Sequence, residues 1–170
     1  MLLERLAEFA PHIAVLVEFL LQTGLRKAEG FNATWDKFNP AAGVLTVKVK
    51  GGHWREVALS ADSMTLLAAL PRHGRYIFDT TNWRKHFDRA LALCQITDFH
   101  WHDLRHTHAT WLGQGGAKLE VVQKSLGHSS ITVTMKYRHV AQREVRDALA
   151  NMPQITRKPS NIRPLLKKAE

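Results

Sequence analysis

The stretch VLTVKVKGGHWREVAL, residues 44–59, decides the fold class of this chain. Apolar and polar side chains alternate before and after the pair Gly51 and Gly52, which is the pattern of two antiparallel strands joined by a tight turn. Lys48 and Lys50 are two positions apart and therefore project from the same side of the predicted hairpin. The sequence thus predicts one small antiparallel ribbon.

The segments around this hairpin mostly follow helical periodicity. Upstream, we expect a mostly apolar helix at 13–22 that is broken at Gly24. Thr23 is placed to cap a second helix that starts at Leu25. Downstream, the expected elements are a helix at 61–71 capped by Ser60, a short strand at 75–79, a helix at 82–95 capped by Thr81, and helices at about 102–113, 118–126, 131–139 and 142–150. The predicted fold class is mainly α with a small antiparallel β-sheet, an α+β architecture.

The length and the C-terminal composition predict one domain and a tail. A chain of 170 residues that is 45% hydrophobic is long enough for one domain with a buried core but short for two. We place that domain at residues 1–152. Residues 153–170 carry three prolines and five Lys or Arg against one Glu, which predicts a basic tail that is exchanged between protomers or disordered.

The charge balance favours a polyanionic partner. Lys and Arg number 24 against 15 Asp and Glu, a formal net charge of +9, so nucleic acid is favoured over a membrane surface. No apolar run reaches the roughly 18 residues of a membrane span. Glu4 and Glu8 interrupt the first apolar run, so no secretory signal is expected. The single cysteine, Cys94, excludes an internal disulfide, is interpreted as a core thiol and fits a reducing cytoplasm.

The segment HWHDLRHTHATW, residues 100–111, gathers histidines around one arginine. Helical spacing divides the segment into a packed face and a polar face. The packed face holds Leu104, His108 and Trp111, and the polar face holds His102, Arg105 and His106.

Three interpretations of this segment remain open from the residues alone. His102 and His106 have the spacing of the two zinc ligands in H-E-x-x-H. Against a metal, no third ligand is evident and Arg105 places a positive charge beside the cation. A hydrogen-bonded polar network over the core suits His100 and His108. An anion pocket suits His102 and Arg105, because a guanidinium forks onto two phosphate oxygens and an imidazole can donate to a third.

Four motifs in a fixed order favour the anion pocket. They are TGLRKAE at 23–29, HDLRHTHATWL at 102–112, LGHSS at 126–130 and TMKYRHV at 134–140. In this order and with these separations they resemble the catalytic domain of the tyrosine recombinases, the phage integrase family, over about residues 11–150. The resemblance implies the fold of that catalytic domain, with a DNA breaking and rejoining activity.

The resemblance also implies a set of site residues. Arg26 matches the first catalytic arginine, His102 and Arg105 match the H-x-x-R pair, His128 matches the second histidine, and Tyr137 matches the nucleophile. Glu29 is implied as the buttress of Arg26, and Asp103 is expected to support the H-x-x-R pair.

The hairpin carries the remaining implied residues. KGGHWREVAL resembles the family pattern K-x-x-K-x-R-x-V-P-L, so Lys50 matches the lysine of the hairpin. His53 stands where the pattern has its second lysine and Ala58 where it has proline, which leaves Lys48 as a rival for the lysine role. We expect Lys48, His53 and Arg55 to contact DNA.

The chemistry of phosphoryl transfer agrees with this set. A tyrosine hydroxyl with a pKa of about 10 is a poor nucleophile at neutral pH unless cations stabilise the phenolate and the charge at phosphorus. Arg26, Arg105, His102 and His128 are placed to do this, and Lys50 is the expected general acid for the leaving 5′ oxygen. Neither a metal, another cofactor nor ATP is expected to be required.

The implied partners are double-stranded DNA and further copies of this chain, as a dimer to tetramer on DNA, with no membrane. Only 25 residues precede Arg26, so we expect the N-terminal clamping domain common in the family to be absent. Two other functions remain open. A type IB topoisomerase-like enzyme would religate the same strand and not exchange it, and an inactive DNA-binding remnant would need only the positive charge.

Overall fold

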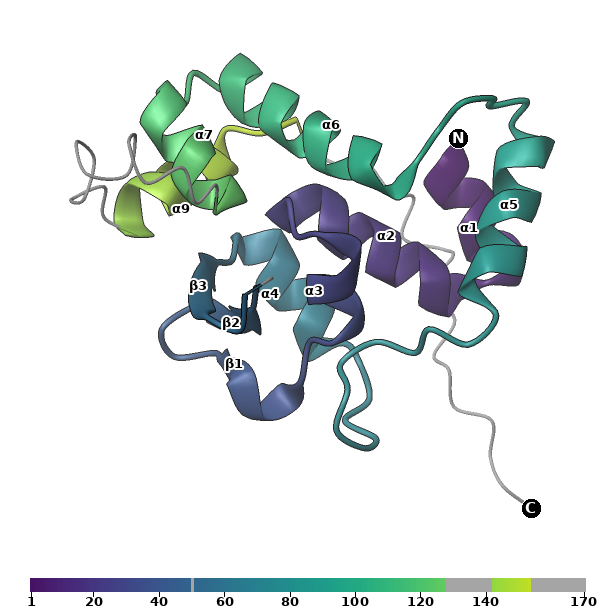
Figure 1. The fold of residues 1–170 in the computed structure, drawn as a ribbon, viewed down its shortest axis with the longest axis horizontal. Helices are drawn as coiled ribbons and strands as arrows, with labels where there is room; N and C mark the ends of the chain where they lie inside the picture. The colour runs from purple at the N-terminus through teal and green to yellow at the C-terminus, as the bar shows by residue number, and fades with distance from the viewer. Residues whose placement is uncertain (50, 128–141, 154–170) are drawn as a thin grey trace.

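The computed structural model describes residues 1–49, 51–127 and 142–153 of the chain (Figure 1). This described part is mostly helical with one small sheet, as the sequence predicts. The helices are α1 (Leu2–Phe9), α2 (Pro11–Thr23), α3 (Lys27–Phe31), α4 (Ala61–Ala68), α5 (Trp83–Leu93), α6 (Trp101–Gln114), α7 (Leu119–Leu126) and α9 (Gln142–Ala150), with a 3-10 turn η1 at Trp35–Lys37. The strands are β1 (Phe38–Asn39), β2 (Val44–Lys48) and β3 (Trp54–Ala58).

Helix α2 forms the centre of the fold. Pro11 occupies its first turn, where a missing N–H breaks no hydrogen bond, and Gly24 ends it with a left-handed φ of 63°. The helix is buried on nearly every side because α1 and α5 cover one end while α4 and α6 pack along it (Figure 1). Its carboxyl end at Gly24 is therefore a fixed point on which a site can be built.

The predicted hairpin is confirmed. Strands β2 and β3 pair antiparallel, with Leu45 opposite Val57 and Lys48 opposite Trp54. Strand β1, which the sequence analysis did not predict, extends the sheet by pairing Phe38 with Leu45, so the strand order is β1-β2-β3. Leu45 and Val57 are buried, so the inner face of the sheet packs on the main core.

The strand predicted at 75–79 is wrong. This segment makes only an isolated bridge, between Tyr76 and Thr34. Residues 71–76 are exposed, whereas Ile77 and Phe78 turn into the main core. Burial of these two side chains, and not a ladder of hydrogen bonds, accounts for the apolar pattern of the segment.

Helix boundaries were predicted well where a side chain or glycine defines the cap. The hydroxyl of Ser60 accepts a hydrogen bond from the backbone N–H of Ser63 at 3.1 Å, as expected for the cap of α4. Two caps were predicted wrongly. Thr81 does not cap α5, whose N-cap is Asn82 with a left-handed φ of 53°. Thr23 donates back to Phe19 O at 2.6 Å, so the next helix starts at Lys27 and not at Leu25. The predicted helix at 131–139 lies outside the described residues.

Two hydrophobic clusters hold the described elements together. The main cluster surrounds α2 and includes Phe87 and Ala90 from α5. The second cluster joins the end of α6 to α7, α9 and the end of β3, through Ala58, Leu112, Val121, Val145, Ala148, Leu149 and Met152. Strand β3 and helix α6 contribute to both clusters, so Arg55 on β3 and Arg105 on α6 lie along the seam where the two clusters adjoin.

None of the helices within 1–49, 51–127 and 142–153 combines the length and the apolar character that a membrane crossing requires. Cys94 is buried and free, as the interpretation of a core thiol requires.

Candidate functional site

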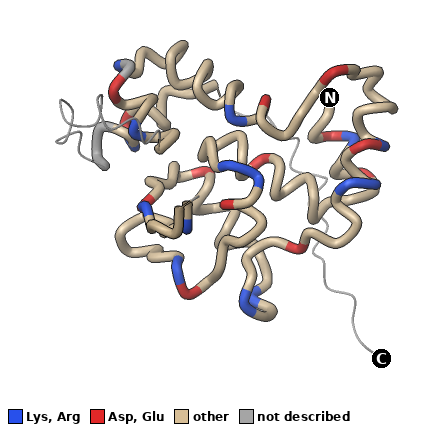
Figure 2. The backbone as a smooth tube through the Cα atoms, viewed as in Figure 1, with Lys and Arg blue, Asp and Glu red and all other residues tan. Residues whose placement is uncertain are grey.

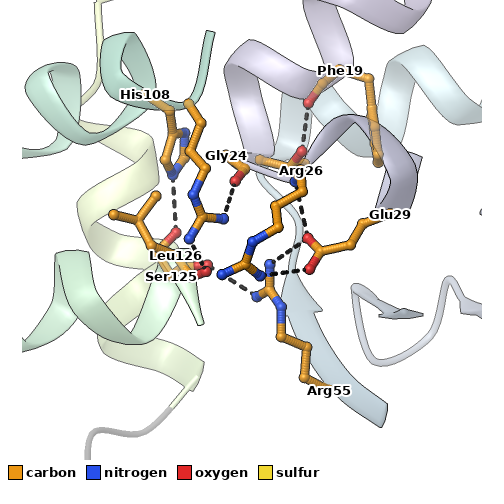
Figure 3. A network of polar contacts seen from close by, with 10 residues as sticks. Phe19, Gly24, Arg26, Glu29, Arg55, His108, Ser125 and Leu126 are labelled. Carbon is orange, nitrogen blue, oxygen red and sulfur yellow. Dashed lines mark hydrogen bonds and ion pairs between the residues drawn. The ribbon is translucent and has the colours of Figure 1, made fainter. Parts of the chain in front are cut away.

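A polar network with three arginines fills the seam between the helix ends (Figure 3). Its side chains come from α6 and α7 on one side and from β3, the end of α2 and the start of α3 on the other. Lys, Arg, Asp and Glu are otherwise interspersed along the described chain (Figure 2). The network is therefore distinguished by three arginines held in hydrogen bonds, of which Arg105 is buried, and not by a general concentration of charge.

Arg105 lies at the bottom of the network. Its side chain is buried, with the residue only 2% exposed, and its two Nη atoms donate to the backbone oxygens of Gly24 at 2.8 Å and of Leu126. These carbonyls lie at the carboxyl ends of α2 and α7, where the helix dipole favours a cation. Helical spacing had placed Arg105 on the polar face of α6, opposite the packed face. It is buried because α7 and the end of α2 close over that side of the helix.

Burial and, to a smaller extent, the positive charges of Arg26 and Arg55 together lower the pKa of Arg105 to about 10, while Glu29 opposes this shift. Arg105 remains protonated at neutral pH. A buried cation with two carbonyl partners and three remaining N–H donors can supply positive charge to an anion above it.

His108 is a structural member of the network. The ring is fully buried, with Nδ1 at 2.9 Å from Leu21 O and Nε2 at 2.9 Å from Ser125 Oγ. A carbonyl only accepts, so Nδ1 carries the proton and the Ser125 hydroxyl donates to Nε2. Burial lowers the pKa of His108 to about 4, which keeps the ring neutral. The interpretation of a polar network over the core therefore holds for His108.

Gly24 permits this arrangement by having no side chain. A Cβ atom at this position would lie 2.4 Å from Cδ2 of His108, and the φ of +63° also disfavours other residues. The same glycine supplies the carbonyl that Arg105 binds. The TGLR motif thus places a glycine where a helix ends, a histidine packs and an arginine is bound.

Arg26 is held by Glu29, as the sequence predicts. Arg26 Nη1 donates to Glu29 Oε1 at 2.9 Å, and the backbone N–H of Arg26 donates to Glu29 Oε2 at 3.0 Å. The pair forms the first turn of α3, so the carboxylate fixes both the helix start and the guanidinium. The Arg26 side chain is 37% exposed and the Glu29 side chain 3%, so the arginine faces outward from a buried base.

Arg55 is the second cation on the Glu29 carboxylate. Its Nη2 donates to Glu29 Oε2 at 3.1 Å and its Nη1 to Ser125 O at 3.1 Å, and its side chain is 14% exposed. Although Arg55 was expected to contact DNA, it points from the inner face of β3 into the network (Figure 3). Sequence reasoning missed this because the inner and outer faces of an alternating ribbon cannot be told apart by a polar residue alone.

The balance of charge around Glu29 is positive. Burial acts to raise the pKa of Glu29, but the attraction of Arg55 and the hydrogen bonds from Arg26 outweigh the effect of burial. The pKa of Glu29 is therefore lowered from its ordinary value. Glu29 is therefore ionised at neutral pH. Glu29 is paired with Arg26 and Arg55 and also attracts Arg105 electrostatically. One negative charge thus faces three positive charges, which leaves a net positive site that is open on the side of Arg26.

His102 lies on the exposed side of α6. Partial desolvation lowers its pKa, as do the positive charges of His106, Arg105 and Arg26, which shows that His102 is within electrostatic reach of both arginines. Its ring meets that of His106 edge-on, with centroids 4.7 Å apart. Asp103 supports this end of the helix by accepting a 2.6 Å hydrogen bond from the backbone N–H of His100. His100 is thus an exposed residue at the start of α6 and not, as expected, part of a core network.

The metal interpretation gains no third ligand. Within the part of the chain that the structure describes, no group of three or more His, Cys, Asp or Glu side chains is placed to hold a metal ion. His102 and His106 accordingly remain a pair. Among the other expected site residues, Lys48 and His53 are exposed at the end of the hairpin. Lys50, His128 and Tyr137 lie outside the described residues.

Comparisons with known proteins identify the family of this chain. Residues 2–144 match the phage integrase family. The chain is 33% identical over 154 residues to the integrase of Salmonella phage P22, covering 74% of this chain and 38% of that protein. It is 32% identical over 141 residues to the tyrosine recombinase XerC of Pelobacter propionicus, covering 74% of this chain and 47% of that protein. The chain therefore spans less than half the length of these curated relatives.

The fold is similar to a solved catalytic domain. The catalytic domain of bacteriophage HP1 integrase is 25% identical, with a TM-score of 0.63 over 88% of this chain and 90% of that domain. The likeness covers nearly all of that domain, so the mainly helical fold with a small sheet is that of an integrase catalytic domain.

Proposed function

The chain belongs to the phage integrase family, and from that premise we propose that it is the catalytic domain of a site-specific DNA recombinase. Tyr137 attacks a DNA phosphodiester, a 3′-phosphotyrosyl bond forms, and the bond from phosphorus to the 5′ oxygen breaks. The 5′ hydroxyl of a partner strand then attacks the phosphotyrosine and releases the tyrosine. Each step exchanges one phosphodiester bond for another, so the reaction needs no ATP.

One observation carries the proposal: Arg26 opens outward from the ionised Glu29, above the buried Arg105, within electrostatic reach of His102. A phosphodiester in transfer carries its negative charge on the non-bridging oxygens, and preorganised cations stabilise it. Arg26 binds these oxygens directly as the accessible guanidinium. Arg105 contributes positive charge and its remaining donors from beneath, held in place by two helix ends.

Proton transfers complete the step. Tyr137 loses its hydroxyl proton as it attacks, and the leaving 5′ oxygen gains a proton from a general acid. The resemblance assigns the general acid to Lys50 on the hairpin. His102, whose lowered pKa favours the neutral ring at pH 7, assists proton transfer at the tyrosine, and His128 donates to a phosphate oxygen.

DNA is bound by positive side chains around this site. Lys48 and His53 are exposed at the end of the hairpin and contact the phosphate backbone. The net charge of +9 supports a polyanionic partner, and affinity for DNA falls steeply with salt. On DNA the chain self-associates, with the basic segment 153–170 reaching a neighbouring copy.

A covalent trapping experiment tests the proposal although the target sequence is unknown. The probe is a duplex library in which random flanks surround one phosphodiester whose bridging 5′ oxygen is replaced by sulfur. The released thiol attacks phosphotyrosine poorly, so the adduct accumulates and survives denaturing electrophoresis. We expect the chain to form an adduct whose trapped sequences converge on one site. Adding a strand with a free 5′ hydroxyl to the adduct should release the tyrosine and join the added strand to the 3′ phosphate, which is the exchanged product.

Tyr137→Phe is expected to abolish the adduct while leaving DNA binding nearly unchanged, because only the nucleophile is removed. The sequence offers a matched control, since it contains two tyrosines and the other, Tyr76, is 52% exposed in the 71–76 loop. Tyr76→Phe should form adducts as the unsubstituted chain does. Adducts that persist in Tyr137→Phe, or none with the unsubstituted chain, would contradict the proposal.

A further inference from the structure

We infer that Arg55 is a positioning residue, which acts through Glu29 on Arg26 and through Ser125 on the end of α7. The inference rests on the proposed function, because Arg26 is the guanidinium assigned to the phosphate. It assigns to Arg55 a role different from the DNA contact that its place in the hairpin suggested.

The first part of the inference is the shared carboxylate. Glu29 Oε2 accepts from both the backbone N–H of Arg26 and Nη2 of Arg55, while Oε1 accepts from Nη1 of Arg26. Arg55 thus fixes the oxygen that holds the start of α3, and Oε1 is left to orient Arg26. A carboxylate held by two groups on one oxygen cannot rotate without breaking both bonds.

The second part is electrostatic. Glu29 alone would neutralise Arg26, and an arginine neutralised at short range attracts a phosphate weakly. Because Arg55 shares the same carboxylate at 3.1 Å, the Arg26–Glu29–Arg55 unit keeps one net positive charge. That charge is exposed where Arg26 is exposed, since the side chains of Arg55 and Glu29 are only 14% and 3% exposed.

The third part is the connection to α7. Nη1 of Arg55 donates to Ser125 O, and the same Ser125 bonds His108 through its hydroxyl. The backbone of Gly127 passes directly against the guanidinium, because a Cβ atom there would lie 2.7 Å from Cδ and Nε of Arg55. Gly127 immediately precedes His128 in the sequence. One side chain of β3 therefore ties the hairpin to the base of Arg26 and to the end of the helix that leads to His128.

The test compares two substitutions of Arg55 with a matched surface control. Arg55→Met removes the charge and keeps most of the length, whereas Arg55→Lys keeps the charge but cannot bind Glu29 and Ser125 with one planar fork. Arg5→Met is the control, because Arg5 forms an exposed pair with Glu8 at 3.1 Å. Both residues lie on α1, which packs beside α5 at the opposite end of α2 from the network (Figure 1). All variants are measured in the full chain with the sulfur-containing duplex library.

Arg55→Met is expected to lower the rate constant of adduct formation at saturating DNA by about 100-fold, the loss typical of a misplaced reacting group. DNA affinity should fall far less than the rate, because Arg55 does not face the DNA and the weaker attraction of Arg26 affects one phosphate contact among several. Arg55→Lys should recover part of the rate, and Arg5→Met should react normally. An unchanged rate in Arg55→Met, or a loss of affinity that equals the loss of rate, would overturn the inference.

A titration without DNA, at a temperature where Arg55→Met is folded, keeps the result interpretable if no adduct forms. The side-chain carboxyl of Glu29 is followed by carbon-13 NMR in the unsubstituted chain, in Arg55→Lys and in Arg55→Met. The contacts predict that the Glu29 pKa stays low in both and rises in Arg55→Met, as the attraction that offsets burial is lost. Equal Glu29 titrations in all three would refute the coupling itself, whereas missing adducts with a normal titration would refute only the proposed function.

Discussion

The two faces of the β2–β3 hairpin place positive side chains in opposite environments. On the inner face, Arg55 is 14% exposed and bonded to Glu29 and to the end of α7. On the outer face, Lys48 is exposed directly across from Trp54, which is itself 55% exposed and lies under the ammonium group of Lys37 at 5.3 Å from the ring centroid. Lys48 on β2 pairs with Trp54, the residue next to Arg55 on β3, so one step in the register separates a cation that organises the site from one that meets the solvent.

The difference shows which arginines depend on their partners. A buried guanidinium loses its hydration and must be bonded on several sides, so its removal leaves buried carbonyls or a carboxylate without a donor. An exposed lysine keeps its hydration, and its removal changes the field around the protein more than its stability. The inner network should therefore respond in stability and rate, and the outer face in DNA affinity and salt dependence.

The largest effect is expected at Arg105. Arg105→Met leaves the carbonyls of Gly24 and Leu126 buried without their donor, which should cost about 2–6 kcal/mol of unfolding free energy. The measurement is urea unfolding at neutral pH. The exposed control Arg5→Met should lose no more than about 1 kcal/mol.

Adduct formation should fall as well in Arg105→Met at temperatures where the variant is folded, because the charge beneath the phosphate is gone. If Arg105→Met and Arg5→Met unfolded at the same urea concentration, the buried arginine would not hold the helix ends together. The distinction between the inner and outer cations would then fail.

The next effect is a pH dependence set by His108. Its folded pKa of about 4 lies below the value of about 6.5 in an unfolded chain, so between these values the unfolded state binds a proton that the folded state does not. The stabilisation is complete above pH 6.5 and is lost as the pH falls towards 4. The total loss should be about 3 kcal/mol.

Urea unfolding from pH 7.5 to 4 measures this slope. His108→Gln, which cannot take up a proton, should remove it, although the variant starts from lower stability. His53→Gln, at an exposed position of the hairpin, should keep the slope of the unsubstituted chain. A slope that persists in His108→Gln would assign the pH dependence to other groups.

The sequence predicted those features that local rules determine. The alternation in 44–59 predicted the hairpin, and the TGLRKAE motif implied Glu29 as the partner of Arg26. Gly24 and Gly127, which end α2 and α7 with positive φ, were both recognised as helix stops. Each of these depends on residues no more than a few positions apart, or on a backbone conformation that glycine alone adopts readily.

The features that were missed depend on contacts between distant segments. Arg105 was placed on the polar face of its helix, and periodicity does not show that α7 and the end of α2 cover that face. Arg55 was expected to contact DNA, because the hairpin pattern does not show that its side chain meets Glu29 and α7. The 75–79 segment looked like a strand because two buried side chains satisfy a short apolar pattern. The four-motif resemblance implied that Arg26, His102 and Arg105 belong to one site, but it could not say which of the arginines is open to solvent.

The smallest effect on stability, and the sharpest test of the outer face, is Lys48→Ala. An exposed strand residue with no ion pair among the described residues should change the unfolding free energy by less than about 0.5 kcal/mol. If Lys48 contacts a phosphate, its removal should weaken binding to any duplex and reduce the slope of log affinity against log salt concentration by about one. Fluorescence anisotropy with a non-specific duplex over a salt series measures that slope. Arg55→Met is the inner-face comparison on the same ribbon and should change the slope by less than Lys48→Ala does, since Arg55 acts on the DNA only through the Glu29 carboxylate and Arg26. Equal changes of slope in the two variants would show that both faces of the hairpin meet the DNA, and the division between a structural and a binding face would have to be abandoned.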